Sequence, residues 1–289
     1  MSIEVEQLHP LYAARIHGLD IRKGLSDAAI ADVRDAMAKH VVCAIGHDAP
    51  PTNEQHIAFS HNFGPMERST RKIAGTDARV PYPEIVDQSN LDEVGEIYAD
   101  DDRRLAYKRA NRLWHTDMSF YDVRATYSLL TAHAIPPVGA DTEFVDMRAA
   151  YDALPEHKKA LIASLIVEHS YWYSRVLGGG PEPTDEERLT RPPARHAMVH
   201  VHAPSKRKAL YLASHACGIV GWPEDKGRAL IAEMLAFATQ PQFVYAHKWR
   251  LGDVLIWDNL ATMHRATEFD DRTFRRDMRR TTCRERALA

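Results

Sequence analysis

The sequence predicts an α+β protein with a mainly β core, built on an antiparallel sheet or barrel. Strand-like segments dominate the second half of the chain, whereas helical patterns come early and between the strands. No regular alternation of strand and helix and no dinucleotide-binding glycine pattern appears, so a doubly wound parallel sheet is not favoured. No repeat or linker divides residues 1–289, and we therefore expect a single domain.

Five segments have the apolar spacing and the end signals of helices. Ser26 is a suitable N-cap for the first, residues 52–55 have the form of a capping box for the second, and Pro223 opens the last. Gly64 ends the second helix, and Pro155 separates the third from the fourth. The predicted helices cover residues 27–40, 53–63, 147–154, 156–167 and 224–238.

Short alternating or continuously apolar runs between turn residues predict the strands. Residues 1–25 predict one or two of them, ending at a turn near Gly18. The other predicted strands cover residues 41–45, 84–89, 127–134, 141–145, 198–201, 209–213, 243–249, 253–257 and 279–283. Residues 171–193 contain three consecutive glycines and several prolines, which predicts a loop. These glycines lack the following Lys-Ser/Thr of a phosphate-binding loop, so nucleotide binding is not favoured.

The segment 66–110 is polar and dense in charge. One interpretation is a solvated surface excursion. The other is a lid over an active site, because long loops in compact domains are often lids. Its position directly before the His115 stretch favours the lid.

The balance of 37 basic and 40 acidic residues gives a net charge of −3, so neither nucleic acid nor an anionic membrane is an expected partner. No apolar run approaches the roughly 20 residues that span a bilayer. The first ten residues have no signal-peptide pattern, and the three cysteines are far apart. We expect a cytoplasmic protein that acts on a small molecule and forms a homo-oligomer.

A candidate metal site lies in residues 111–120, where His115 and Asp117 are two residues apart. On a strand, such side chains point to the same face and can reach one cation. His264, which follows a buried strand, could complete the two-His-one-carboxylate set of non-haem Fe(II) oxygenases. A lone histidine there is more often structural. A zinc site of His200, His202 and His215 is the alternative.

An arginine-rich segment covers residues 272–286. A solvated basic patch or contact with a phosphate backbone would explain it. If it is a strand, however, Arg276 and Arg280 share one face, and Arg279 lies on the other. Two guanidinium groups on an inward face beside a metal imply two anionic ligands, because each can bind a carboxylate through two hydrogen bonds.

These patterns together resemble the TauD/TfdA family of Fe(II)- and 2-oxoglutarate-dependent dioxygenases, over nearly the whole chain. Within it, the chain is most similar to the branch that oxidises aryloxyalkanoates such as 2,4-dichlorophenoxyacetate. The likeness is carried by residues 9–11, 57–59, 62–65, 113–117, 141–144, 146–155, 238–240, 243–245, 257–259, 264–265 and 279–282. The set of His-x-Asp, a late histidine and an arginine twelve residues after it is the specific part. One departure is Ala140, where the family often has a second glycine.

The resemblance implies a double-stranded β-helix, a cupin-like jelly roll with flanking helices. It implies that iron is held by the catalytic residues His115, Asp117 and His264. It also implies a 2-oxoglutarate site at Thr142, Arg276 and Asn111, and substrate contacts at Arg280, Arg71, Lys72, His202 and His215. His202 and His215 are equally well explained as structural histidines. The lid has a sequence of its own, so the resemblance does not decide which substrate is bound.

The implied reaction uses O2 and converts 2-oxoglutarate to succinate and CO2. The carbon next to the ether oxygen is hydroxylated, and the product breaks down to a phenol and a 2-oxo acid, glyoxylate or pyruvate. The alternatives are the same chemistry on a sulfonate such as taurine, the zinc hydrolase, and a binding module whose arginine face holds an anion. Dependence on Fe(II) and 2-oxoglutarate distinguishes them.

Overall fold

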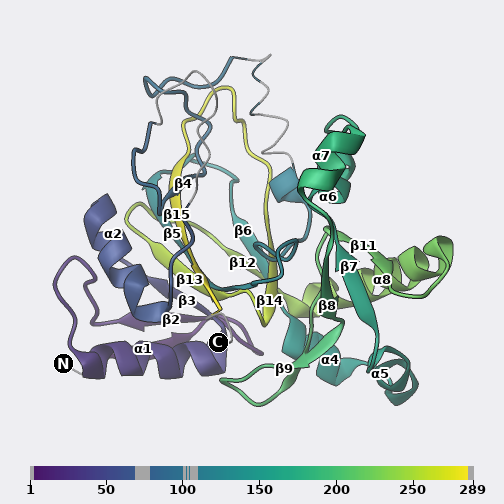
Figure 1. The fold of residues 1–289 in the computed structure, drawn as a ribbon. Helices are drawn as coiled ribbons and strands as arrows, with labels where there is room; N and C mark the ends of the chain where they lie inside the picture. Colours follow the sequence, from purple (N-terminus) through teal and green to yellow (C-terminus); the bar gives the residue numbers. More distant parts are fainter. Residues whose placement is uncertain (1–2, 69–78, 100–101, 103, 105–109, 286–289) are drawn as a thin grey trace.

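The computed structural model describes residues 3–68, 79–99, 102, 104 and 110–285 (Figure 1). The strands in this part of the chain are β1 (Glu4–Gln7), β2 (Ala14–His17), β3 (Val42–Ile45), β4 (Val86–Asp87), β5 (Ala125–Ala134), β6 (Thr142–Asp146), β7 (Ile166–His169), β8 (Ala194–Ala197), β9 (Val199–Val201), β10 (Lys208–Leu210), β11 (Ala216–Ile219), β12 (Val244–His247), β13 (Val254–Asp258), β14 (Thr262–Ala266) and β15 (Asp277–Arg284). The helices are α1 (Asp27–His40), α2 (Asn53–Ser60), α4 (Met147–Ala153), α5 (Glu156–Ile162), α6 (Tyr171–Leu177), α7 (Asp185–Thr190) and α8 (Glu224–Ala238), with 3-10 turns η1 (His61–Phe63), η2 (Ala110–Arg112) and η3 (Pro241–Phe243).

Two facing sheets form the centre of the molecule. The larger has seven strands in the order β1-β2-β3-β13-β5-β15-β4, and the smaller has the order β12-β6-β14. Phe144 of β6 packs against Leu130, Leu255 and Met278 of the larger sheet. This closed, mostly antiparallel pair of sheets is a jelly-roll arrangement, as predicted.

The outer face of the large sheet is covered by α1 and α2 (Figure 1). Along β13, Leu255 and Trp257 point into the jelly roll, whereas Val254 and Ile256 pack with α1 and α2. This alternation follows from the two-residue period of a strand. A strand buried on both faces needs the continuous apolar run that the sequence has here.

A second apolar core lies under β7–β11, α4, α5 and α8. It is joined to α1 by Arg148, which is fully buried and paired with Asp146 at 2.9 Å. The Arg148 guanidinium also donates to the backbone oxygens of Ala38 and Lys39. Because the last carbonyls of a helix have no partner within it, this contact both caps α1 and fixes the two cores together.

The early helices begin where predicted, and α1 also ends where predicted, whereas α2 ends at Ser60 and continues to Phe63 as the 3-10 turn η1. The Ser26 side chain accepts a hydrogen bond from the Ala29 N–H, and Thr52 and Gln55 form a capping box. The apolar spacing of α2 predicts that Ile57 lies in the hydrophobic core, but its side chain is only half-buried. His56 is fully buried instead. The helix predicted over 224–238 is α8, with the same ends.

Three local predictions are wrong. The helix predicted over 156–167 ends at Ile162, because the following residues form β7 and pair with β8 and β11. The loop predicted over 171–193 contains α6 and α7. Their N-caps, Ser170 and Thr184, supply the hydrogen bonds that start each helix, and these caps outweigh the nearby glycines and prolines. The strand predicted over 84–89 is reduced to the two residues of β4.

The described parts of segment 66–110 lie along β15. Met66 forms an isolated bridge with Cys283, and β4 pairs with Arg279 and Arg280. The Gln88 N–H donates to the Met278 oxygen. These described residues therefore run beside the strand that carries the arginines.

Candidate metal and anion site

The two-residue spacing suggested that His115 and Asp117 lie on a strand. In the structure they do not lie on a regular strand. His115 forms an isolated bridge with His264 of β14, with N···O distances of 3.0 and 2.7 Å in the two directions. The chain then turns, and Met118 has a φ of 60°. The bridge brings the two histidine rings to a centroid distance of 4.2 Å.

His115, Asp117 and His264 form a buried group whose ligating atoms lie within 4.8 Å of one another. His264 Nε2 lies 3.9 Å from Asp117 Oδ2, which is too far for a hydrogen bond. Two ligand atoms that each lie about 2 Å from one ion can be at most about 4 Å apart, so this pair lies just within reach of one ion. Among the described residues, this is the one group of three side chains that fits a metal ion.

The charge state of the group suits a divalent cation. Burial lowers the pKa of His115 and lowers that of His264 well below its usual value, so both rings are neutral. Burial would raise the pKa of Asp117, but chiefly the Arg280 guanidinium, with the Ser128 hydrogen bond, lowers it to about 2. His115 Nδ1 lies 2.8 Å from the Leu113 oxygen, to which it must donate, and its Nε2 is left as an acceptor for a metal.

A set of buried polar side chains fixes the position of Asp117 through hydrogen bonds. Ser128 Oγ on β5 donates to Asp117 Oδ2 at 2.7 Å. Asn259, directly after β13, bonds to Ser128, to the Asp117 N–H and to the Trp257 indole. Thr116 Oγ1 donates to the Asn259 backbone oxygen at 2.7 Å. The carboxylate is therefore fixed by partners from two strands of the large sheet.

Arg276 is a buried cation without a carboxylate partner among the described residues. Its side chain is deeply buried, and burial lowers the pKa of the guanidinium to about 10. Its Nη1 donates to the Gln88 backbone oxygen at 3.3 Å, and the Asn111 amide donates to the Gln88 side chain at 3.1 Å. Burying an unpaired charge is costly, so this arrangement is suited to receiving an anion.

The predicted alternation along β15 is confirmed for Arg279 and Arg280, whereas Arg276 lies one residue before the strand. Arg280 points into the jelly roll and its Nη1 pairs with Asp117 Oδ1, whereas Arg279 on the other face pairs with Asp277. The Arg280 Nε is buried and has no hydrogen-bond partner in the described structure. Arg280 thus lies directly beside the candidate metal group, with donor capacity left for a second anion.

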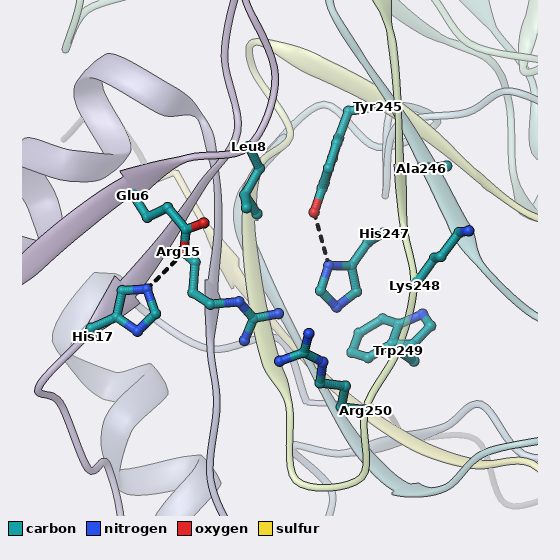
Figure 2. Close-up of a pocket in the computed structure, with 10 residues that line it drawn as sticks. All are labelled: Glu6, Leu8, Arg15, His17, Tyr245, Ala246, His247, Lys248, Trp249 and Arg250. Carbon is teal, nitrogen blue, oxygen red and sulfur yellow. Dashed lines mark hydrogen bonds and ion pairs between the residues drawn. The ribbon is translucent and has the colours of Figure 1, made fainter.

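Thr142 begins β6 and is buried. Its Oγ1 accepts a hydrogen bond from the Trp249 indole at 3.0 Å. Trp249 also lines a surface hollow of about 530 Å³ between β1, β2 and β12, together with Leu8, Arg15 and Tyr245 (Figure 2). The hollow contains none of the predicted site residues, and it touches the site through the Trp249–Thr142 bond.

The remaining predicted contacts are placed differently. Arg71 and Lys72 lie outside the described residues. His215 is buried beside the metal group, with its ring centroid 6.4 Å from that of His115 and its Nδ1 3.1 Å from Ser119 Oγ. His202 is buried with Asp258 at 2.9 Å and Ser205 at 2.7 Å on its two nitrogens, which are the contacts of a structural histidine.

The zinc alternative of His200, His202 and His215 is wrong. His200 Nε2 bonds to the Leu260 backbone oxygen, so these three histidines have separate partners and do not meet. The three do not form a ligand group in the described structure.

Sequence analysis missed Gln88, Ser128 and Asn259. Residues 257–259 were part of the family resemblance, but nothing in their spacing assigned a role to the asparagine. Ser128 and Asn259 are 131 positions apart, so only the pairing of β5 with β13 reveals their contact. Gln88 lies in the strand predicted over residues 84–89, and nothing in that pattern indicates a contact with Arg276 or Asn111.

A buried set of two histidines and one carboxylate inside a jelly roll is the arrangement of the metal-dependent oxygenases. Residues 4–282 match the family described as "Taurine catabolism dioxygenase TauD, TfdA family". The chain belongs to this family and is a dioxygenase.

Two relatives are similar over the whole chain. One, from Burkholderia sp. (strain RASC), is named alpha-ketoglutarate-dependent 2,4-dichlorophenoxyacetate dioxygenase and is 41% identical over 98% of this chain and 94% of its own. The relative of the same name from Cupriavidus pinatubonensis is 39% identical over the full length of both chains.

A solved structure, AAD-2 in complex with Mn(II) and N-oxalylglycine, superposes with a TM-score of 0.93 at 42% identity, covering 99% of each chain. This similarity confirms the predicted fold. Within the described residues, no helix is long and apolar enough to cross a membrane.

Proposed function

We propose that this protein is an Fe(II)- and 2-oxoglutarate-dependent dioxygenase that hydroxylates the carbon next to the ether oxygen of an aryloxyalkanoate such as 2,4-dichlorophenoxyacetate. The observation that carries the proposal is the buried Arg276, which has no carboxylate partner among the described residues, together with the buried His115, Asp117 and His264 group. A site with a cation ligand set and a separate buried guanidinium suits a cosubstrate that chelates a metal and has a second, distant carboxylate.

In this proposal His115, Asp117 and His264 hold the iron, and two neutral nitrogens with one carboxylate oxygen fit that ion. When bound, the iron together with 2-oxoglutarate and O2 supplies the oxidising equivalent for hydroxylation, with formation of succinate and CO2. His115 is oriented by the Leu113 oxygen, so its ring presents Nε2. The buried position of all three side chains excludes water from the reacting centre.

Arg276 and Thr142 hold the distal carboxylate of 2-oxoglutarate. The Trp249 indole donates to Thr142 Oγ1, so the single hydroxyl hydrogen of Thr142 is free to donate to an anion. Asn111 and Arg276 are held in place through Gln88, which contacts both. The contact with the Gln88 backbone oxygen gives the Arg276 guanidinium a hydrogen-bond acceptor before the cosubstrate arrives.

Arg280 binds the carboxylate of the primary substrate. Its place beside Asp117 puts an anchored carboxylate, and therefore the adjacent C–H group, next to the metal. Hydroxylation of that carbon gives a hemiacetal. The bond from this carbon to the aryl oxygen then breaks, the hydroxyl proton passes to the phenol, and the carbonyl of the 2-oxo acid forms. An acetate substrate gives glyoxylate, and a propionate gives pyruvate.

The same proposal extends to the parts of the chain around this site. Segment 66–110, with Arg71 and Lys72, would cover the site as a lid, and its described part already runs beside β15. His215 lies near enough to His115 to contact a bound substrate. We also propose that the whole chain acts as one domain, as a homo-oligomer in the cytoplasm.

The test is release of succinate from 2-oxoglutarate by the full chain with Fe(II) and ascorbate, measured over phenoxyacetates, 2-phenoxypropionates and taurine. We expect succinate and a phenol with the aryloxy acids, and little turnover with taurine, because the two named relatives with similarity over the whole chain act on 2,4-dichlorophenoxyacetate. Succinate release with taurine alone would replace the carboxylate substrate by a sulfonate. No substrate-dependent succinate with any of them would overturn the proposal.

A further inference from the structure

The hydrogen bonds behind Asp117 have only one possible direction. The Asp117 N–H and the Trp257 indole N–H can only donate, and both meet the same Asn259 side-chain atom at 3.1 Å. That atom must therefore be the carbonyl oxygen of the amide. The Asn259 amide nitrogen then faces Ser128 Oγ at 2.9 Å and donates to it.

This direction fixes the Ser128 hydroxyl in turn. Its oxygen accepts from Asn259, and its one hydrogen is donated to Asp117 Oδ2 at 2.7 Å, a much shorter contact than the 3.4 Å from Ser128 Oγ to Thr282 Oγ1. Asp117 Oδ2 is the acceptor in this bond, because the Ser128 oxygen already accepts from Asn259. Ser128 and Asn259 are both buried, so no bulk water competes for these bonds.

The same asparagine also reaches the histidine side of the group. The Trp257 ring, whose N–H is held by Asn259, packs against His264 with ring centroids 4.7 Å apart. Asn259 therefore contacts Asp117 directly and supports His264 through one aromatic ring. An iron ligand that is held in orientation loses less freedom when the metal binds.

We propose that Ser128 and Asn259 are positioning residues that orient the Asp117 carboxylate and thereby set the affinity of the metal site. This inference rests on the proposed metal-binding function of His115, Asp117 and His264. Neither residue contacts the metal or the substrates in this account. They act through Asp117, and their effect is on metal binding before any reaction.

The experiment is calorimetric titration of the metal-free full chain with Mn(II), without 2-oxoglutarate. Ser128→Ala leaves Asp117 Oδ2 without its donor, while Arg280 still pairs with Oδ1, and is expected to weaken Mn(II) binding about 10- to 100-fold. Ser128→Thr keeps the hydroxyl and should restore affinity to within a few-fold. Asn259→Ala frees the Ser128 hydroxyl to rotate and should give an intermediate loss.

The matched control is Ser60→Ala. Ser60 is also fully buried, and its hydroxyl bonds to Thr281 Oγ1 at 2.7 Å on the side of the large sheet that faces α2. This variant loses a buried hydroxyl of the same kind and should bind Mn(II) as the wild type does. The unfolding temperature of each variant separates a loss of fold from a loss of affinity.

The outcomes are distinct. If the wild type binds no Mn(II), or Asp117→Ala binds it equally well, the proposed metal site fails. If the wild type binds and Ser128→Ala has the same affinity, the positioning role is overturned while the site stands. Equal weakening by Ser60→Ala would also overturn it. If Ser128→Ala does not fold, Asn259→Ala decides, and an unchanged affinity in that variant overturns the inference.

Discussion

Single residues carry the chemistry, and their identities were largely readable from the sequence. His115, Asp117 and His264 were found from spacing and family resemblance, and the structure brings their side chains together. The alternation along 275–280 separated Arg276 and Arg280 from Arg279 because a strand has a two-residue period. The supporting residues were not found, since Ser128 and Asn259 meet only when β5 pairs with β13.

Arg276 should be needed for tight binding of 2-oxoglutarate. Arg276→Gln removes the buried charge and should weaken 2-oxoglutarate binding by about 10- to 100-fold, because a charge-assisted hydrogen-bonded pair contributes about 1.5–3 kcal/mol. Binding is measured by anaerobic titration of the Mn(II)-loaded chain. Mn(II) affinity should stay unchanged, since Arg276 is not in the ligand group. Wild-type affinity for 2-oxoglutarate in this variant would remove Arg276 from the cosubstrate site.

Arg280 gives the complementary prediction. Arg280→Gln should raise the KM for 2,4-dichlorophenoxyacetate at least tenfold, because the anchor of the substrate carboxylate is lost. The binding of 2-oxoglutarate should change much less than in Arg276→Gln. A comparison of both ligands in both variants assigns each arginine to one anion. The assignment is reversed if Arg280→Gln impairs 2-oxoglutarate and leaves the aryloxy acid untouched.

At the scale of elements, the sequence predicted those whose signals are local. The ends of α1, α2 and α8 follow from caps and apolar spacing within a few residues. β7 was mistaken for the end of a helix because its four residues are a strand only through pairing with β8 and β11. β14, which carries His264, is likewise defined by its ladder with β6, from Thr262↔Asp146 to Ala266↔Thr142.

Trp249, which follows β12, donates a hydrogen bond to Thr142 at the start of β6, and this contact should affect 2-oxoglutarate binding. Trp249→Phe keeps the ring but removes the indole N–H that orients Thr142. The hydroxyl can then rotate, and we expect 2-oxoglutarate binding to weaken by a few-fold, in keeping with about 1 kcal/mol for one neutral hydrogen bond. Thr142→Val should weaken binding at least as much. If Trp249→Phe binds 2-oxoglutarate as the wild type does, the indole does not orient Thr142.

At the scale of the whole molecule, the mainly β core with flanking helices was predictable, whereas the order of the strands was not. The sequence shows which runs are buried on both faces, such as β13, but neighbours such as β3 and β13 are more than 200 residues apart. Tyr12, before β2, illustrates this: its hydroxyl lies 2.6 Å from the Phe144 oxygen and 2.9 Å from that of Phe243.

The stability of the whole fold should depend on pH through buried neutral histidines. Burial lowers the pKa of His56 to about 3, whereas an unfolded histidine has a pKa of about 6.5. As the pH falls from about 6.5 towards 3, the unfolded state takes up a proton that the folded state does not. His56 therefore costs no stability above pH 6.5, and below it the free energy of unfolding falls by about 1 kcal/mol per pH unit.

Urea unfolding at pH 7 and pH 5 measures this slope. His56→Gln, compared with the wild type, should show a smaller loss of stability between the two pH values, even though it is less stable at pH 7. His169, whose pKa burial also lowers to about 3, accounts for part of the loss that remains. The same pH dependence in both proteins would mean that His56 is protonated in the folded state.

We propose that one buried iron site couples oxidation of 2-oxoglutarate to cleavage of an aryloxyalkanoate. The most direct measurement is the yield of succinate and 2,4-dichlorophenol from the full chain supplied with Fe(II), 2-oxoglutarate, O2 and 2,4-dichlorophenoxyacetate. The account predicts equal amounts of the two products from the wild type and neither from Asp117→Ala. Undiminished product formation by Asp117→Ala, or phenol formed without 2-oxoglutarate, would contradict it.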